Sequence, residues 1–466
     1  MNQVSSSPTI AIIGGGLAGL AAGCALSGAG YRVTLFERRP YLGGRASSYQ
    51  HPGTSETVDN CQHVLLGCCT NLLHFYQQTG VAAKIRWYDR LTFLEPGGRA
   101  STLGGSWLPA PLHTAPSFLA ARCLGMTDKL AIARAMLRLI PAAPGDSGEP
   151  FLDWLRRHRQ TDRAVARFWK TVLVSALNED LEQISVSAAG KVFRDSFLKS
   201  AEAGRMGVPC VPLTELYNAA GDYIRSRGGE LRLRATVESF QAQPQRFTLC
   251  SGGQEQIFDF GVFAVPFDAL GKMLPGIPQA QPLRDAIARF ETSPITGIHL
   301  WFDREISSLD HAVLLDRTIQ WMFHKSRLLG RATTGEPSYV ELVVSSSTSL
   351  VEKSRQEIID LALGELKEFF PAARTAQLVK STVIKEVHAT YSPRPGIDAY
   401  RPTNQTNWPR VFLAGDWTAT GWPATMEGAV RSGYLAAEAL MRASGAANAK
   451  CTVDELAPRG FMRLFP

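Results

Sequence analysis

The chain has 466 residues, 45% hydrophobic and 20% charged, and 49 Lys and Arg against 42 Asp and Glu give it a net charge of +7. It is long enough for two globular domains around one crevice. The positive charge is dispersed, without runs of five or six like charges, which argues against a nucleic-acid partner and leaves weak attraction to an anionic membrane surface open. Without an apolar stretch of about 18 residues or an export-type N-terminus, the protein is expected in the cytoplasm, with at most peripheral contact to the inner face of the cell membrane.

The first predicted element is a buried parallel strand at residues 10–13, which form a continuous apolar run. A G-x-G-x-x-G pattern and a helix over residues 17–28 follow. The first glycine allows a tight turn, the second allows close approach of a pyrophosphate, and the third lets the helix pack near the strand. The residues expected at the phosphates, including the N–H groups that begin the helix, are Gly14, Gly16, Leu17, Ala18 and Gly19.

A second strand over residues 31–36 ends at Glu37, roughly 20 residues after the first glycine, where a carboxylate accepts hydrogen bonds from ribose hydroxyls. A 2′-phosphate beside Glu37 would meet like charge, so the pattern favours FAD or NAD over NADP. Two glycines downstream allow backbone to pass close to a bound dinucleotide, and Arg45 can neutralise pyrophosphate charge. The residues of this basic, glycine-containing segment expected at the cofactor are Arg38, Arg39, Gly43, Gly44 and Arg45.

Further strands are expected within residues 230–240 and 258–265. Near the other end, residues 411–414 form an apolar strand closed by Gly415 and Asp416, and residues 426–440 have helical periodicity. The start of that helix would direct a positive dipole at its neighbour.

Together these segments resemble the flavin amine oxidase and carotenoid desaturase superfamily, on whose pattern Glu37, Arg39, Gly43, Gly44 and Arg45 fall. The resemblance implies an FAD cofactor. It also implies that Asp416 contacts the ribityl or pyrophosphate region, that backbone at Val237 touches adenine, and that the helix starting at Met426 and Glu427 points to the flavin ring. The implied fold is α/β, with a Rossmann-type FAD-binding domain and an inserted, mixed α+β substrate-binding domain.

The predicted domains are discontinuous. Residues 1–90, 205–265 and 405–450 are assigned to the FAD-binding domain, residues 91–204 and 266–404 to the substrate-binding domain, and residues 451–466 to a C-terminal tail. The substrate site is expected between the domains.

Two departures weaken an amine-oxidase function. No Lys occurs between Lys272 and Lys325, across the expected central strand of the substrate domain, and Thr425 stands where such enzymes often carry a Tyr. Four segments, VDNCQHVLLGCCTNLLHFYQQTG from Val58, SALNEDLEQISVSAAGKVFRDSFL from Ser175, MGVPCVPLTELY from Met206 and SPITGIHLWFDR from Ser293, instead resemble the hydroxysqualene dehydroxylase family. That resemblance implies that hydride from reduced FAD replaces an allylic hydroxyl of hydroxysqualene, giving squalene for hopanoid or triterpenoid synthesis.

Such a reaction needs a proton donor for the departing hydroxyl. Asp59, Gln62 and His63 are the candidates, with His63 or Asp59 donating the proton and Gln62 orienting the hydroxyl; structural hydrogen bonding beneath the flavin is the equally weighted alternative. The predicted partners are a long apolar isoprenoid substrate and a transient electron donor such as NADPH or a reductase. A carotenoid-type polyene desaturase or saturase is the second candidate function, and a binding component beside prenyl synthases is the third.

Residues 108–141 interleave apolar and basic side chains. This pattern favours a pair of core-facing helices, and a surface that rests on a membrane is the alternative.

Overall fold

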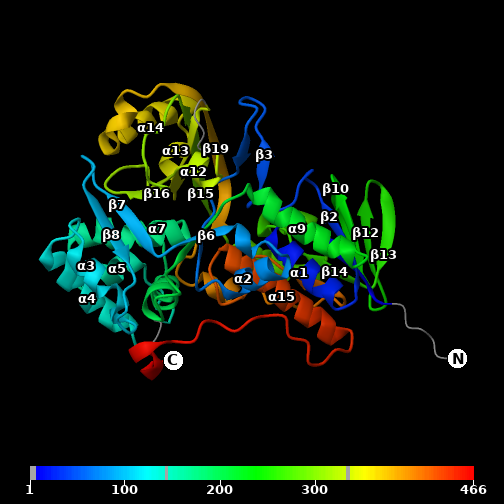
Figure 1. Cartoon of the computed structure of the whole chain (residues 1–466). Coiled ribbons are helices and arrows are strands. Elements are labelled where there is room, and N and C mark those ends of the chain that lie inside the picture. The colour runs from blue at the N-terminus through cyan, green and yellow to red at the C-terminus, as the bar shows by residue number, and fades with distance from the viewer. Residues whose placement is uncertain (1–6, 142–144, 332–335, 466) are drawn as a thin grey trace.

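The computed structural model describes residues 7–141, 145–331 and 336–465. Its first sheet is parallel, in the order β10-β2-β1-β14-β20. Figure 1 shows β10, β2 and β14 of this sheet in the half of the molecule that carries the N-terminus. Strand β1 (Thr9–Ile13), helix α1 (Leu17–Gly28) and strand β2 (Arg32–Glu37) form the predicted unit at the N-terminus. The other strands are β10 (Glu230–Leu233), β14 (Phe260–Phe263) and β20 (Val411–Leu413). Three distant parts of the chain thus build one sheet, and the Rossmann-type α/β fold is confirmed.

Both faces of this sheet are covered, which is why its strands read as continuous apolar runs. Ile10 and Ile12 of β1 pack with α1, α9 (Leu213–Ser226) and α15 (Met426–Ala443). Ala11 and Ile13 pack on the opposite face against a three-stranded antiparallel sheet. The strands of that smaller sheet are β11 (Val237–Ala242), β12 (Phe247–Ser251) and β13 (Gln254–Phe258).

A seven-stranded sheet forms the second part of the molecule, in the order β19-β15-β18-β17-β16-β7-β8. Its strands are β7 (Arg90–Leu94), β8 (Ala100–Gly104), β15 (Thr292–Phe302), β16 (His311–Leu314), β17 (Trp321–Phe323), β18 (Ser338–Ser345) and β19 (Leu378–Tyr391). Helix α14 (Arg355–Phe369) packs on one face of this sheet. The opposite face of its central strands is turned to the cavity described below.

The remaining elements connect and flank these layers. The short sheets are formed by β3 (Ser48–Gln50) with β4 (Thr57–Asp59), and by β5 (Leu65–Leu66), β9 (Met206–Pro209) and β6 (Ile85–Tyr88). The other α-helices are α2 (Thr70–Gln78), α3 (Ala115–Ala120), α4 (Met126–Leu139), α5 (Phe151–Arg157), α6 (Asp162–Ala164), α7 (Thr171–Leu177), α8 (Val186–Val192), α10 (Phe267–Met273), α11 (Gln281–Ile287), α12 (Lys325–Leu328) and α13 (Thr348–Val351). Helices α3 to α8 share a separate hydrophobic cluster with β7 and β16.

The limits of the two predicted domains and of the C-terminal tail stay predictions, and residues 1–6, 142–144, 332–335 and 466 lie outside the described part of the chain. Among the helices that the structure describes, none combines the length and hydropathy needed to cross a bilayer.

Candidate functional site

A cavity of about 600 Å³ lies where the parallel sheet meets the seven-stranded sheet. Fourteen of the sixteen residues that the sequence assigned to the cofactor line it: Gly14, Gly16, Leu17, Ala18, Glu37, Arg38, Arg39, Gly43, Gly44, Arg45, Val237, Gly415, Asp416 and Met426. The other two, Gly19 and Glu427, contact neighbouring elements instead, as described below.

The turn between β1 and α1 is built for close backbone approach. Gly14 has a φ of +110°, which L side chains rarely adopt. A Cβ at Gly19 would lie 2.0 Å from the Gly14 carbonyl oxygen, so this glycine serves helix packing, as the sequence predicted. Within the described residues, no side chain caps the N-terminus of α1 at Gly16, and the first helical residues line the cavity. Uncapped N–H groups at a cavity suit a pyrophosphate, which supports the fit of a dinucleotide here.

Glu37 holds the same turn from the end of β2. One carboxylate oxygen accepts a hydrogen bond from the Gly15 N–H at 2.7 Å, and the other accepts one from the Arg39 N–H at 2.7 Å. The carboxylate therefore braces the phosphate loop while lining the cavity. A ribose contact by Glu37 stays a prediction that this position allows.

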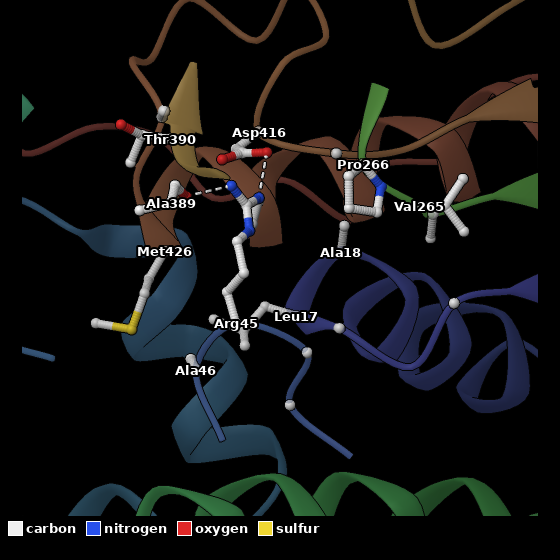
Figure 2. A pocket seen from close by; sticks show the side chains of 18 of the residues that line it. Leu17, Ala18, Arg45, Ala46, Val265, Pro266, Ala389, Thr390, Asp416 and Met426 are labelled. Atoms are coloured by element: carbon white, nitrogen blue, oxygen red, sulfur yellow. Dashed lines mark hydrogen bonds and ion pairs between the residues drawn. The ribbon is translucent and has the colours of Figure 1, made fainter. Parts of the chain in front are cut away.

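Segments far apart in the chain meet at Arg45. Its guanidinium donates to the Asp416 carboxylate at 2.7 Å and to the Ala389 carbonyl oxygen at 2.6 Å, and Figure 2 shows this side chain reaching across the cavity wall. Arg39 donates to the Gly44 carbonyl oxygen at 3.0 Å and fixes the loop that carries Arg45. The ion pair neutralises both charges locally and ties the N-terminal loop to the end of β20.

Helix α15 starts at the cavity wall. The Thr425 hydroxyl accepts a hydrogen bond from the Gly428 N–H and caps the helix, and Met426 lines the cavity. Glu427 points elsewhere: its buried carboxylate accepts hydrogen bonds from Asn71 and Leu72 at the start of α2. The helix that starts at Met426 and Glu427 therefore meets the cavity through Met426, whereas the Glu427 side chain, about 100° further round the helix, packs against α2 and is corrected as a cofactor contact.

Gln62 and His63 line the cavity, whereas Asp59 lies behind them. The His63 Nδ1 is 2.7 Å from the Cys61 carbonyl oxygen. Since a carbonyl oxygen only accepts hydrogen bonds, Nδ1 carries a proton, and in the neutral ring Nε2 is an acceptor. Burial lowers the pKa of His63, which favours this neutral form. The group predicted as a proton donor is thus an acceptor in its major form.

Asp59 forms a buried ion pair that the sequence analysis missed. Its carboxylate accepts from the Lys325 ammonium at 2.6 Å and from the Ser48 hydroxyl at 2.6 Å, and the side chains of Asp59 and Lys325 are only 3% and 2% exposed. Burial alone would raise the pKa of Asp59, but Lys325 and the other hydrogen-bond donors lower it. Of the two roles expected for Asp59, proton donation is corrected and structural hydrogen bonding agrees with the structure, because the carboxyl is ionised, buried and already paired.

Lys325 also donates to the Gln62 side-chain oxygen at 2.7 Å. This contact assigns the Gln62 amide, whose nitrogen donates to the His63 carbonyl oxygen at 3.0 Å. The ion pair behind the cavity therefore orients a side chain that lines it.

Glu341 extends this cluster, with one carboxyl oxygen 3.5 Å from the Lys325 ammonium. It shares a face of β18 with Val343 and Ser345, which line the cavity, and it is paired across the sheet with His299 of β15. Burial raises the pKa of Glu341 to about 8 and lowers that of His299 to about 3, so both are neutral near pH 7. Lys325 and Asp59 are then the charged members of the cluster.

No local sequence pattern predicts this cluster, because its members lie far apart in the chain: Asp59 ends β4, and Lys325 follows β17. In the sequence, Lys325 shows only that it stands just after the apolar strand β17; its burial and its pairing with Asp59 follow from the tertiary structure.

Asn178 is a further lining residue. Its amide nitrogen donates to the Ser293 carbonyl oxygen and the Thr390 hydroxyl, and its oxygen accepts from the Ser346 N–H. It ends α7 in the left-handed conformation and fastens the helical region to the sheet.

Comparison with known proteins agrees with this geometry. Residues 17–441 match the family model described as flavin containing amine oxidoreductase. The chain is 28% identical over 456 residues to the hydroxysqualene dehydroxylase of Rhodopseudomonas palustris, covering 94% of this chain and 100% of that protein. It is 26% identical over 469 residues to the 15-cis-phytoene desaturase of Synechococcus elongatus, covering 93% and 95%.

Solved structures share the fold. A putrescine oxidase double mutant has a TM-score of 0.72 at 15% identity, covering 94% of this chain and 99% of its own. An oxidoreductase from Methanosarcina mazei has a TM-score of 0.70 at 16% identity, covering 93% and 100%. At these identities the structures support the fold alone. The family match, together with the glycine turn, the uncapped α1 and the Arg45–Asp416 pair, shows that the chain belongs to the flavin-containing amine oxidoreductase family and uses FAD as its cofactor.

Proposed function

We propose that this protein is a reductive dehydroxylase that converts hydroxysqualene to squalene in hopanoid or triterpenoid synthesis. The observation that carries the proposal is a pair of polar side chains, Gln62 and His63, placed beside an apolar part of the cavity wall. That wall includes Val64, Ile295, Trp321, Phe323 and Val343. A polar group in an apolar site is costly unless it finds a partner, and a hydroxyl on an otherwise apolar chain supplies one.

One of the two side chains can donate a hydrogen bond to a hydroxyl, and the other can accept one from it. One N–H of Gln62 donates to the His63 carbonyl, and its second N–H has no partner among the described residues, so it can donate to the hydroxyl oxygen. In the neutral ring, the His63 Nε2, opposite the bonded Nδ1, can accept a hydrogen bond from the hydroxyl, and after protonation the same nitrogen can donate to the hydroxyl oxygen. Binding of this kind fixes the carbon–oxygen bond against the apolar wall.

The hydroxyl must leave as water, which requires one proton in addition to the hydride. Bound FAD in its reduced form supplies the hydride. His63, protonated at Nε2, is the lining residue placed to supply the proton, since Asp59 is withdrawn into its ion pair. Because burial lowers the pKa of His63, this mechanism predicts that the rate of the chemical step increases as the pH falls towards that pKa.

The experiment is a single turnover without oxygen. Purified protein reduced with dithionite is mixed with hydroxysqualene, and squalene is expected in an amount equal to the flavin reoxidised. His63→Gln and Gln62→Leu are compared at equal flavin content. They are expected to slow the chemical step by about 100-fold and about 10-fold, as for a general acid and a hydroxyl-binding group. Failure to form squalene, with protein that is folded and fully loaded with flavin, would refute the proposal.

A polyene desaturase is the second candidate, favoured by the phytoene desaturase relative at 26% identity. In that case the oxidised protein would turn over phytoene and the reduced protein would leave hydroxysqualene unchanged. A long apolar isoprenoid substrate is common to both proposals. The transient reductant, NADPH or a reductase, and the cytoplasmic location remain proposals as well.

A further inference from the structure

Helix α4 and the C-terminal segment carry large apolar side chains that the fold leaves in solvent. On α4, Leu130 and Leu137 are 56% and 63% exposed, and in the C-terminal segment Phe461 and Leu464 are 54% and 74% exposed. Trp107, on the loop before α3, is 90% exposed. Helix α4 packs on a hydrophobic core, as expected of a core-facing helix over residues 108–141, and its opposite face exposes Leu130 and Leu137. The core-facing side is buried through Ala131, Ile132, Ala135 and Leu139.

Hydrogen bonds place the C-terminal segment beside both the loop of Trp107 and the end of α4. The Phe461 N–H donates to the Ala110 carbonyl oxygen at 2.8 Å, which places the C-terminal segment beside the loop of Trp107. Arg194 donates to the carbonyl oxygens of Ile140, at the end of α4, and of Phe465. Figure 1 shows α3, α4 and the C-terminal segment at the same end of the molecule.

The exposed charges of this surface are positive. Arg134 and Arg138 stand on the exposed face of α4 between and beside the two leucines, and Arg463 lies between Phe461 and Leu464 in the sequence. Asp128, the acidic residue of α4, is buried and accepts hydrogen bonds from Gly125 and Thr161. An apolar stripe next to cations, with none of the helix's negative charge exposed, suits an anionic interface.

We propose that this surface, defined by Trp107, Leu130, Arg134, Leu137, Arg138 and the segment Phe461–Leu464, binds the protein to an anionic lipid bilayer. The leucines, Phe461 and Trp107 insert among the lipids, and the arginines lie at the headgroups. A second copy docked through the same face would bring arginines against arginines about a two-fold axis, so charge favours the bilayer. The inference does not depend on the substrate.

The experiment is vesicle co-sedimentation of the full-length, flavin-loaded protein. Vesicles of phosphatidylcholine with about one third phosphatidylglycerol are compared with vesicles of phosphatidylcholine alone. The wild-type protein is expected to bind the anionic vesicles, with affinity falling as salt rises. Leu130→Gln with Leu137→Gln is expected to weaken partitioning about tenfold or more. Arg134→Gln with Arg138→Gln is expected to weaken it about fivefold for each arginine and to reduce the salt dependence.

The three-stranded sheet supplies a matched control. Ile257 is 62% exposed on β13, so Ile257→Gln removes an equally exposed apolar side chain, and Arg246→Gln removes an exposed arginine before β12. Both controls are expected to partition like the wild type, and flavin content reports whether each variant is folded. Equal losses in the controls, or no binding of the wild type to anionic vesicles, would overturn the proposal. Self-association that the leucine variants abolish, without vesicle binding, would assign the surface to a second copy instead.

Discussion

Replacing Lys325 with Met isolates the electrostatic contribution of the ion pair beneath the cavity. Met fills the space of the Lys325 side chain with an uncharged chain of similar length. The change removes the ammonium group, which lies 2.6 Å from the Asp59 carboxylate and 2.7 Å from the Gln62 oxygen. Asp59 is then left as a buried carboxylate without its cation. Breaking a buried pair from one side costs about 3–5 kcal/mol. Asp59 keeps hydrogen bonds from Ser48 and Leu213, so we expect about 3 kcal/mol, near the lower end.

The double variant, with Lys325→Met and Asp59→Asn, separates the charge effect from loss of packing. It removes both charges and leaves no uncompensated ion in the interior. Because neutral replacements of buried pairs are often tolerated, the double variant should be more stable than the Lys325 single variant by about 1–2 kcal/mol. Lys380→Met is the control: its ion pair with Glu56 has the same type of contact, at 2.7 Å, but its side chain is 38% exposed. The expected cost of the control is below about 1 kcal/mol.

Urea unfolding of the flavin-loaded variants, followed by circular dichroism and flavin fluorescence, measures these differences as shifts in midpoint at constant slope. The reasoning is refuted if Lys325→Met destabilises the protein no more than Lys380→Met. It is also refuted if the double variant is as unstable as the sum of the two single variants.

Three further predictions follow from the same geometry. Burial raises the pKa of Glu341 to about 8, so the folded state keeps a proton that the unfolded chain loses above about pH 4.5. The free energy of unfolding should therefore fall, by at most about 1.4 kcal/mol per pH unit, as the pH rises between these two values. Glu341→Gln should remove this slope in urea midpoints measured from pH 5 to 8. Gly19→Ala should abolish flavin retention after gel filtration, because its Cβ would lie 2.0 Å from a carbonyl oxygen of the preceding turn. The control Gly364→Ala in α14, with open space around it, should keep the flavin and raise the free energy of unfolding by up to about 1 kcal/mol. Arg45→Met should weaken FAD binding by about 10- to 100-fold in a titration of the apoprotein, since Asp416 is left unpaired at the cavity wall; unchanged affinity would mean that the pair has no part in cofactor binding.

The cofactor half of this site could be predicted from the sequence because its information is local. Gly14, Gly19 and Glu37 stand at fixed spacings along one strand–turn–helix–strand unit, and each spacing translates directly into a backbone conformation or a contact. The apolar runs of β14 and β20 likewise predicted buried strands, although pairing with β1 follows only from the sheet order.

The reactive half was decided by tertiary structure. Lys325, Asp59 and Glu341 come from α12, β4 and β18, and no spacing in the chain relates them. Their charge states depend on burial and on each other. Asp59 is a paired anion, although the sequence left proton donation and structural hydrogen bonding equally open, and His63 is an acceptor in its neutral form because Cys61 supplies a carbonyl oxygen at its Nδ1. The amphipathic pattern of α4 likewise does not distinguish a helix that faces a protein core from one that faces lipid. Periodicity determines which residues share a face, but the neighbouring elements decide what that face meets.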